Sequence, residues 1–515
     1  MRYLFSLFLL LVIILWSSCR KDFESGPSTG NLQFSTDTLF LDTVFTNIGS
    51  STYSFKVYNR TGDDFTIPSI ILERGENSNY RLNVDGIPGK SFENIQVLAK
   101  DSIFVFVETT TDISNQTTDT EFLYTDRILF DQGGNQQDVD LVTLVKDAVF
   151  IKPNRDCMVI NGEEVCTIEG VTVGDATISA HVLSDEELIF TNEKPYVIYG
   201  YAVIPNDKTL TIEAGARVHF HANSGIIAAD NATLLVNGDI STDPERMENE
   251  VIFEGDRLEP IFSDVPGQWG TIWFTPGSTG HIINHATIKN ATVGVFMNSN
   301  NGGATPALSI TNTKIFNSSN VGLLARAANV EGENLVINNA GQVSLNCSLG
   351  GVYNFNHCTF ANYSSIGPDF RELPTVLIDN NLQVSETEII IADLVEANFT
   401  NCIIYGDQDI ELILSKLDGT AFNYSFKNCL IRFNDFDDSF TDNPLYNFTN
   451  TDLFENIILN EDPAFKAPFE NMLTIDDNSP ANGRAAISTS GVDILGVPRS
   501  ASAPDIGAYE SAAFE

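Results

Sequence analysis

Two acidic loops in the last quarter of the chain hold the residues best suited to catalysis or cation binding. The loop Asn434-Asp435-Phe436-Asp437-Asp438 follows Arg432, and the loop Gly406-Asp407-Gln408-Asp409 precedes it. Paired carboxylates can act as general acid and base or hold Ca²⁺, and a nearby guanidinium can bind an acidic substrate. The candidate catalytic set is therefore Asp407, Asp409, Arg432, Asp435, Asp437 and Asp438, with Ca²⁺ as the cofactor they could hold.

A solvated-loop interpretation of these residues is the stronger alternative. The Asn434 loop lacks the glycine that known Ca²⁺ loops place at their sharpest turn. Residues 281–368 are rich in Asn, Ser, Thr and Gly and offer no evident acid–base pair, because their charged residues are few: Glu331, Glu333, Lys289, Lys314 and Arg326. His219 and His221 share one face of an expected strand but lack a third ligand. We therefore predict no metal site and favour a non-catalytic role.

Cys157 and Cys166 bracket the dipeptide Asn161-Gly162, which is the strongest two-residue hairpin signal. An exported chain meets an oxidising compartment, so this spacing predicts a disulfide that closes the hairpin. The alternative is a metal-binding pair. It is weaker, because no second cysteine pair follows at zinc-finger spacing.

A repeat organises the second half of the chain. The repeat is a four-residue pattern: Asn or His first, a small or apolar residue second, any residue third, and Ile or Phe fourth. It begins at His285, Asn312, Asn334, His357, Asn401 and Asn428. The spacings are 27, 22, 23, 44 and 27 residues. This period indicates a stacked repeat architecture, with 44 residues as two turns or as one turn with an insertion. We expect the first position in a left-handed turn and the second facing inward, so that Cys358, Cys402 and Cys429 form one interior column of reduced thiols.

The segments before and after the repeat resemble known protein families. The segments Tyr196–Gly200, Leu210–Gly215, Val218–Phe220 and Gln268–Ile272 are similar to the opening coils of right-handed parallel β-helix proteins of the pectate-lyase-like superfamily. The tail, with Asn478–Ala481, Asp493–Arg499 and Pro504–Glu510, resembles the choice-of-anchor Q ending of similar proteins. The resemblance implies a β-helix in an envelope setting and carries no catalytic motif.

Short alternating runs separated by turn formers fill residues 32–150. About seven strands in this length are typical of an antiparallel sandwich. The segment Asp42–Asn59 resembles immunoglobulin-like modules of bacterial envelope proteins. The predicted organisation is signal peptide 1–18, lipidated tether 19–31, immunoglobulin-like sandwich 32–150, hairpin and cap region 151–195, right-handed parallel β-helix 196–465 and C-terminal cap 466–515. We expect the 151–195 region and the tail to cover the two open ends of the solenoid, because exposed strand edges invite aggregation.

We predict an export signal at the N-terminus. Its apolar run, Leu4–Trp16, is too short to span a bilayer comfortably but suits a signal-peptide core. Ser17-Ser18-Cys19 resembles the lipobox of Gram-negative lipoproteins, which implies that Cys19 is diacylated and anchors the protein. The alternative is an ordinary secretory signal with an incidental cysteine. Arg20–Glu24 resembles a signal for export to the outer face of the outer membrane, so both the periplasmic and the extracellular face stay open.

The charge composition limits the classes of molecule that the protein is expected to bind. The chain has 69 acidic and 28 basic residues, for a net charge of −41. Nucleic acids are excluded as partners because phosphate binding needs clustered Lys and Arg. The leading hypothesis is an outer-membrane lipoprotein with a binding or structural role toward glycans or other envelope components, because stacked repeats present long polar walls. The alternative is a β-helix polysaccharide lyase or glycoside hydrolase.

Overall fold

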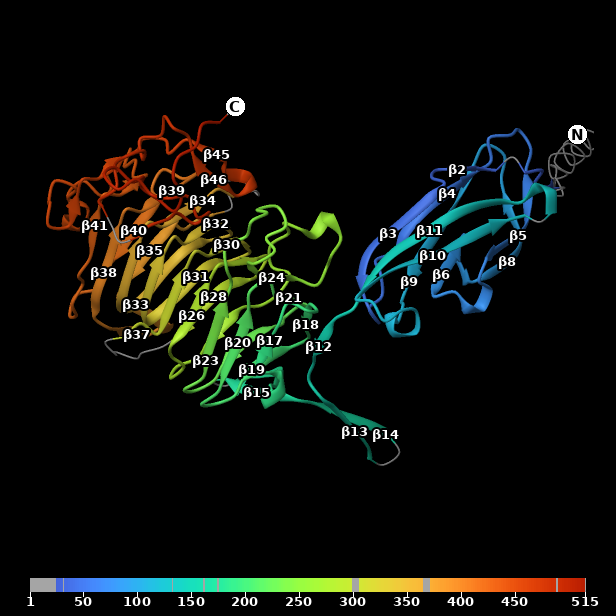
Figure 1. The fold of residues 1–515 in the computed structure, drawn as a ribbon, viewed down its shortest axis with the longest axis horizontal. Helices are drawn as coiled ribbons and strands as arrows, with labels where there is room; N and C mark the ends of the chain where they lie inside the picture. Colours follow the sequence, from blue (N-terminus) through green and yellow to red (C-terminus); the bar gives the residue numbers. More distant parts are fainter. Residues whose placement is uncertain are drawn as a thin grey trace, which may run out of the picture. The chain divides into compact units, whose positions relative to one another are not determined.

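The computed structural model describes residues 25–514, apart from 31, 132, 161–162, 174–175, 299–304, 365–370 and 488–489. The signal peptide, Cys19 and the Asn161-Gly162 turn lie outside the described residues. As predicted, the fold is all-β, and its largest sheets are parallel (Figure 1). The chain divides into two compact units, Met1–Asp147 and Ala148–Glu515. No helix in the described ranges is long and apolar enough to cross a membrane.

The N-terminal unit has two sheets that share one core. The first sheet contains β1 (Gly26–Pro27), β3 (Thr38–Phe45), β5 (Phe65–Leu72), β8 (Ser91–Val97), β10 (Glu121–Phe130) and β11 (Gln137–Lys146). The second contains β2 (Gln33–Phe34), β4 (Tyr53–Tyr58), β6 (Tyr80–Val84), β7 (Ile87–Gly89) and β9 (Ser102–Thr109). Alternate residues face the core, so Val105 and Val107 from one sheet pack with Ile128 and Leu141 from the other. Most neighbouring strands are antiparallel.

An 11-stranded parallel sheet runs the length of the C-terminal unit. Its strands, in order, are β12 (Val149–Ile151), β18 (Tyr196–Ile198), β21 (Arg217–Phe220), β24 (Val251–Gly255), β27 (Ala286–Lys289), β30 (Lys314–Ser318), β32 (Val336–Ala340), β34 (Thr359–Asn362), β39 (Ile403–Gly406), β42 (Leu430–Ile431) and β44 (Ile458–Leu459).

An 18-stranded sheet completes this unit in two parallel series of strands. The series called row 1 contains β19 (Tyr201–Ile204), β22 (Gly225–Ala228), β25 (Ile272–Phe274), β28 (Val293–Asn298), the first halves of β31 (Val321–Glu333) and β33 (Val343–Asn356), β35 (Val376–Asp379) and β40 (Leu412–Ser415). Row 2 contains β20 (Thr209–Glu213), β23 (Thr233–Asn237), β26 (His281–Asn284), β29 (Leu308–Thr311), the second halves of β31 and β33, β38 (Leu394–Thr400), β41 (Ser425–Lys427) and β43 (Phe454–Glu455).

The chain visits these three strand series in turn, and each circuit is one rung. Ile315 pairs with Ile337, Ile337 with Phe360, Phe360 with Ile404, and Ile404 with Ile431. The step between β34 and β39 is therefore a single rung with an insertion, which decides between the two alternatives for the 44-residue spacing. The insertion includes the antiparallel hairpin β36 (Asn381–Ser385) and β37 (Glu388–Ile391).

The repeated four-residue pattern marks one corner of six successive rungs, at β27, β30, β32, β34, β39 and β42. All six first-position residues have positive φ, from 46° at His285 to 56° at Asn401, which confirms the predicted left-handed turn. The second-position side chains are fully buried, which confirms that they face inward. Cys358, Cys402 and Cys429 are buried free thiols in this interior column. Asn side chains also bond from rung to rung, as Asn334 Nδ2 does to Asn312 Oδ1 at 2.9 Å.

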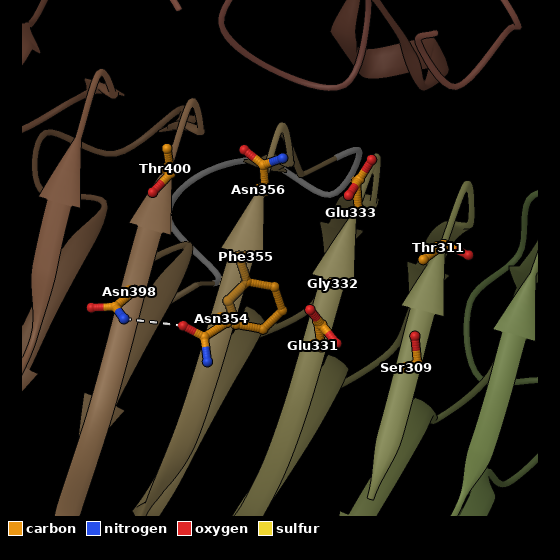
Figure 2. Close-up of a pocket in the computed structure, with 10 residues that line it drawn as sticks. All are labelled: Ser309, Thr311, Glu331, Gly332, Glu333, Asn354, Phe355, Asn356, Asn398 and Thr400. Atoms are coloured by element: carbon orange, nitrogen blue, oxygen red, sulfur yellow. Dashed lines mark hydrogen bonds between the residues drawn. The ribbon is translucent and has the colours of Figure 1, made fainter. Parts of the chain in front are cut away.

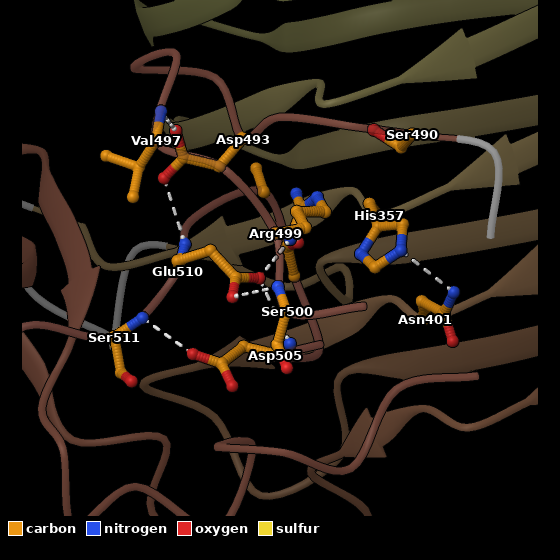
Figure 3. Close-up of polar contacts among 12 residues, drawn as sticks. His357, Asn401, Ser490, Asp493, Val497, Arg499, Ser500, Asp505, Glu510 and Ser511 are labelled. Atoms are coloured by element: carbon orange, nitrogen blue, oxygen red, sulfur yellow. Dashed lines mark hydrogen bonds and ion pairs between the residues drawn. The ribbon is translucent and has the colours of Figure 1, made fainter. Parts of the chain in front are cut away.

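The C-terminal tail, residues 466–514, covers a side of the stack rather than an end, which corrects the sequence-based expectation of an end cap. Its Leu473, Ile494 and Tyr509 pack on the outward side chains Val336 and Ala361 of the 11-stranded sheet. Polar contacts hold the tail against the corner asparagines: Arg499 Nη2 donates to Asn334 Oδ1 at 2.8 Å, and Ala486 N donates to Asn401 Oδ1 at 2.8 Å. Within the tail, Arg499 Nη1 pairs with Glu510 Oε1 at 2.8 Å (Figure 3). The tail lies here because Val336, Ile403 and Leu430 are apolar at outward positions and need cover.

The 151–195 region covers an end of the stack only in part. Its strands β16 (Ala176–Val182) and β17 (Ile189–Phe190) pair in parallel with β19 and β20 of the first complete rung. Strand β15 (Gly170–Val173) pairs with β16. The hairpin of β13 (Arg155–Ile160) and β14 (Glu163–Ile168) instead projects from the unit (Figure 1). At the opposite end an aromatic cluster lies beside the last rungs: Phe433, Phe440, Tyr446, Phe448 and Phe454.

Short 3₁₀ turns and one further strand pair complete the described elements. The turns are η1 (Gly75–Asn77), η2 (Ile113–Asn115), η3 (Gly133–Asn135), η4 (Asp185–Glu187), η5 (Pro260–Phe262), η7 (Pro444–Tyr446) and η8 (Pro468–Glu470). In the tail, β45 (Phe465–Ala467) pairs with β46 (Met472–Ile475) in antiparallel fashion.

His181 on β16 contacts two carboxylates, that of Glu169 just before β15 and that of Glu187 in η4. Its Nδ1 lies 3.2 Å from Glu169 and its Nε2 3.0 Å from Glu187. Burial lowers the pKa of His181, but the hydrogen bonds with both glutamates outweigh it and raise this pKa overall. Burial also raises the pKa values of Glu169 and Glu187, and their hydrogen bonds outweigh that effect and lower both overall.

Replacing His181 by Gln is expected to destabilise the C-terminal unit most at mildly acidic pH. The raised histidine pKa gives stability that is present below its unfolded value and lost as pH rises through its folded value. The lowered glutamate pKa values give stability that is lost as pH falls through their folded values. Denaturant unfolding should therefore show a difference on the order of 1 kcal/mol near pH 5.5 that shrinks toward pH 8.5. A difference independent of pH would contradict this assignment.

Candidate functional site

Asp407, the first residue of the predicted catalytic set, is a counter-ion whose side chain is 10% exposed. Its carboxylate contacts the Arg371 guanidinium at 2.6 Å and accepts from Ser364 N at 3.0 Å. Arg371 also contacts Glu411 at 2.6 Å, and both of these side chains have no solvent exposure. Burial lowers the pKa of Arg371, but its bonds to Glu411 and Asp407 raise it overall. Asp407 is thus held in a structural charge cluster that sequence reasoning missed, because neither Arg371 nor Glu411 belongs to a pattern.

The other five predicted residues divide into two groups. Asp409 and Arg432 come together from successive rungs, with Oδ1 and Nη2 3.4 Å apart, and the Asp409 carboxylate is more than half exposed. The remaining three engage their own loop: Asp435 accepts from Ser439 N and Phe440 N, Asp437 from Ser439 N, and Asp438 from Thr441 Oγ1. The hydrogen bonds with Ser439 lower the pKa of Asp437. These contacts give the loop acids turn-forming roles.

Cys157 and Cys166 are opposite each other on β13 and β14 and form a disulfide. Together with Glu164 they are also the one group of potential metal ligands found within the described residues, but the disulfide occupies both sulfur atoms. His219 Nδ1 lies 3.2 Å from the carbonyl oxygen of Gly255, and His221 Nδ1 lies 2.8 Å from Asp256. Both histidines therefore have structural partners.

A polar groove of about 410 Å³ lies on the outer face of row 2. Four successive rungs line it, with the side chains shown in Figure 2: Ser309, Thr311, Glu331, Gly332, Glu333, Asn354, Phe355, Asn356, Asn398 and Thr400. The strand registers align the outward residues in two ladders. One ladder is Ser309, Glu331, Asn354 and Asn398; the other is Thr311, Glu333, Asn356 and Thr400. Outward and inward residues alternate because side chains on a strand point to opposite faces.

Hydrogen bonds between rungs fix the amides of the groove. Asn398 Nδ2 donates to Asn354 Oδ1 at 3.0 Å (Figure 2), and Ser425 Oγ donates to Asn398 Oδ1 at 2.7 Å. Asn401 Nδ2 donates to Asn356 Oδ1 at 3.3 Å. With their oxygens engaged in this way, Asn354 and Asn356 can each offer Nδ2 donors to a ligand.

Glu331 and Glu333 supply the acceptors of the groove. They stand two residues apart on β31, so both carboxylates lie on the outer face. Neither forms an ion pair with a base among the residues that the structure describes. Both are the scarce acids of residues 281–368. Their proximity to Asn354 and Asn398 cannot be read from the sequence, because it is set by the register across rungs of unequal length.

Comparisons with known proteins leave the family open. No protein-family model matches this chain, and no curated protein matches it. Among solved structures, a family 123 glycoside hydrolase from Clostridium perfringens aligns with a TM-score of 0.15, 10% identity, and coverage of 22% of this chain and 26% of that chain. The E. coli chaperone DraB aligns with a TM-score of 0.16, 11% identity and coverage of 24% and 58%. An α-1,3-glucanase of family GH87 from Streptomyces thermodiastaticus aligns with a TM-score of 0.26, 10% identity and coverage of 73% and 79%. These likenesses carry no argument about function.

Proposed function

We propose that this chain is a lipid-anchored protein of the bacterial outer membrane that binds glycans along the row 2 groove. In this proposal the C-terminal unit is a right-handed parallel β-helix of the pectate-lyase-like type. The N-terminal unit is an immunoglobulin-like sandwich that spaces it from the membrane, and the tail is a choice-of-anchor Q-like ending. The three parallel strand series, visited in turn on each rung, support the β-helix. Two mainly antiparallel sheets over one core support the sandwich.

The observation that carries the binding role is the double ladder of the groove. Hydroxyl, amide and carboxylate groups recur on four successive rungs, spaced by ~4.8 Å along the stack. This spacing is close to the length of one pyranose ring, so an extended glycan can place one sugar on each rung. Sugar hydroxyls both donate and accept, which matches Nδ2 donors beside carboxylate acceptors.

Glycan binding can be tested with the mature chain and a panel of soluble oligosaccharides in isothermal titration calorimetry. Replacing Asn354 by Ala removes a groove amide and should weaken binding about tenfold, as expected for the loss of about 1.4 kcal/mol of hydrogen bonding. The matched control is Asn423→Ala, because Asn423 bonds to Val395 O outside the groove. Equal effects of the two variants, or no binding across the panel, would contradict the proposal.

The alternative is a polysaccharide lyase or glycoside hydrolase. One observation favours it: Glu331 and Glu333 place two carboxylates side by side in the groove. Release of shortened products from the same panel, abolished by Glu331→Gln or Glu333→Gln, would support catalysis. Activity dependent on Ca²⁺ and on Asp409 would instead support the acidic loops first identified in the sequence.

If the protein is lipid-anchored, loss of the acylated cysteine should move it completely from the membrane fraction to the soluble fraction. Replacing Cys19 by Ala removes the thiol that would be acylated, so the variant should leave the membrane fraction and become soluble. Fractionation with metabolic labelling by a fatty acid measures both effects. Cys347→Ala is the matched control, since Cys347 is a free thiol buried in the C-terminal unit. A Cys19→Ala variant that stays in the membrane fraction would exclude the anchor.

A further inference from the structure

We infer that the row 2 groove selects glycans that carry free amino groups and discriminates against uronic acids. This inference rests on the proposed glycan-binding function and names the substrate class. The groove presents the carboxylates of Glu331 and Glu333, and no Lys, Arg or His is among the described residues that line it. Glu396, two residues before Asn398 on β38, accepts a hydrogen bond from the Asn398 side chain and adds a third carboxylate nearby.

On another outer face of the same unit, partly buried glutamates form ion pairs with lysines. On the 11-stranded sheet, Glu254 contacts Lys289 at 2.8 Å, and Glu250 contacts Lys314 at 3.2 Å. Each of these four side chains is less than a quarter exposed. Glu331 and Glu333 lack such partners among the described residues and keep negative charge in a hollow open to a ligand. A ligand ammonium group can supply the missing counter-charge through charge-assisted hydrogen bonds.

The groove amides define where the ammonium group would lie. The oxygens of Asn354 and Asn356 are engaged by Asn398 and Asn401, so these residues offer donors rather than acceptors. The ligand's own donors must then meet Glu331 and Glu333, which have only acceptor atoms when ionised. A uronate would instead set its carboxylate beside two like charges, which opposes binding.

The test compares three oligosaccharides of equal length: glucosamine, its N-acetylated form, and galacturonate. Calorimetry with the mature chain should show that the glucosamine oligomer binds at least about tenfold more tightly than the N-acetylated form. The galacturonate oligomer should bind most weakly. In the double variant Glu331→Gln/Glu333→Gln the preference for the glucosamine oligomer over its N-acetylated form should disappear, because that preference depends on the two carboxylates.

A control variant that neutralises the same number of carboxylates outside the groove separates the effect of the groove from that of the protein's net negative charge. Asp185→Asn/Asp418→Asn neutralises two exposed carboxylates outside the groove, with side chains 72% and 99% exposed. It should keep the glucosamine preference. A preference lost equally in both double variants, or kept in the groove variant, would overturn the inference. So would tighter binding of a lysine-rich peptide of the same charge. Failure of all three oligosaccharides to bind would instead overturn the proposed function itself.

Discussion

Replacing Arg371 by Leu is expected to lower the free energy of unfolding of the C-terminal unit by about 3–5 kcal/mol. Arg371 is the base in contact with Glu411, whose carboxylate is fully buried. Without the guanidinium, a buried carboxylate keeps hydrogen bonds from Thr375 and Gln408 but loses its counter-charge. An uncompensated buried charge costs far more than a broken surface ion pair, so this is a large effect for one substitution.

Denaturant unfolding, monitored by tryptophan fluorescence, measures this loss of stability in the C-terminal unit. Trp269 and Trp273 both lie in the C-terminal unit, and Trp16 lies in the predicted signal peptide. The double variant Arg371→Leu/Glu411→Leu should recover part of the stability, because it removes both fully buried charges and leaves only Asp407, whose side chain is partly exposed, without its partner. Asp409→Asn is the matched control for an exposed pair and should cost less than about 1 kcal/mol. A double variant as unstable as Arg371→Leu would show that packing, not charge, is responsible.

Replacing Asn401 by Val is expected to cost about 3–5 kcal/mol, from backbone strain and lost hydrogen bonds together. Asn401 is fully buried with φ at 56°, a conformation that a β-branched residue adopts only with strain. Its side chain also accepts from Ala486 N in the tail and donates to His357 Nε2 at 3.1 Å (Figure 3). Burial, with a smaller contribution from Arg499, lowers the pKa of His357 to about 3, so its neutral ring can accept this bond.

Asn401→Gly separates the two contributions. Glycine tolerates positive φ, so this variant loses only the side-chain bonds and should cost about 1–3 kcal/mol. Tryptophan-monitored unfolding measures both variants, and limited proteolysis of the tail reports whether residues 466–514 detach. Equal stabilities of the Val and Gly variants would contradict the assignment of strain to this corner.

The repeat could be predicted from the sequence because it depends on local backbone chemistry. A left-handed corner favours Asn and His, and the residue after it must fit the interior, so both positions leave a readable pattern. The pattern predicted the turn at His285 and Asn401 and the inward thiol of Cys402, all of which the structure has. It left the 44-residue spacing ambiguous, because an insertion adds length without disturbing the corner.

The prediction that the tail caps an end of the stack was wrong, because the surface that the tail covers forms only when the strands pair. The third position of the repeat accepts any residue, and it becomes apolar at Val336, Ile403 and Leu430. That change is the one local signal that an outer face is covered. The sequence did not show which segment covers it, because the contacts of Arg499 and Ala486 cross more than eighty residues.

By itself, the sequence determined the all-β class, the repeat corners and the inward column, because these follow from interactions within a few residues. Only the tertiary structure decided which polar groups share a groove and which acids are neutralised. Glu331, Asn354 and Asn398 become neighbours through strand register, and Asp407 is taken up by Arg371 through packing. Both depend on rung lengths that insertions change, so the chemistry of this surface is set by how the rungs stack.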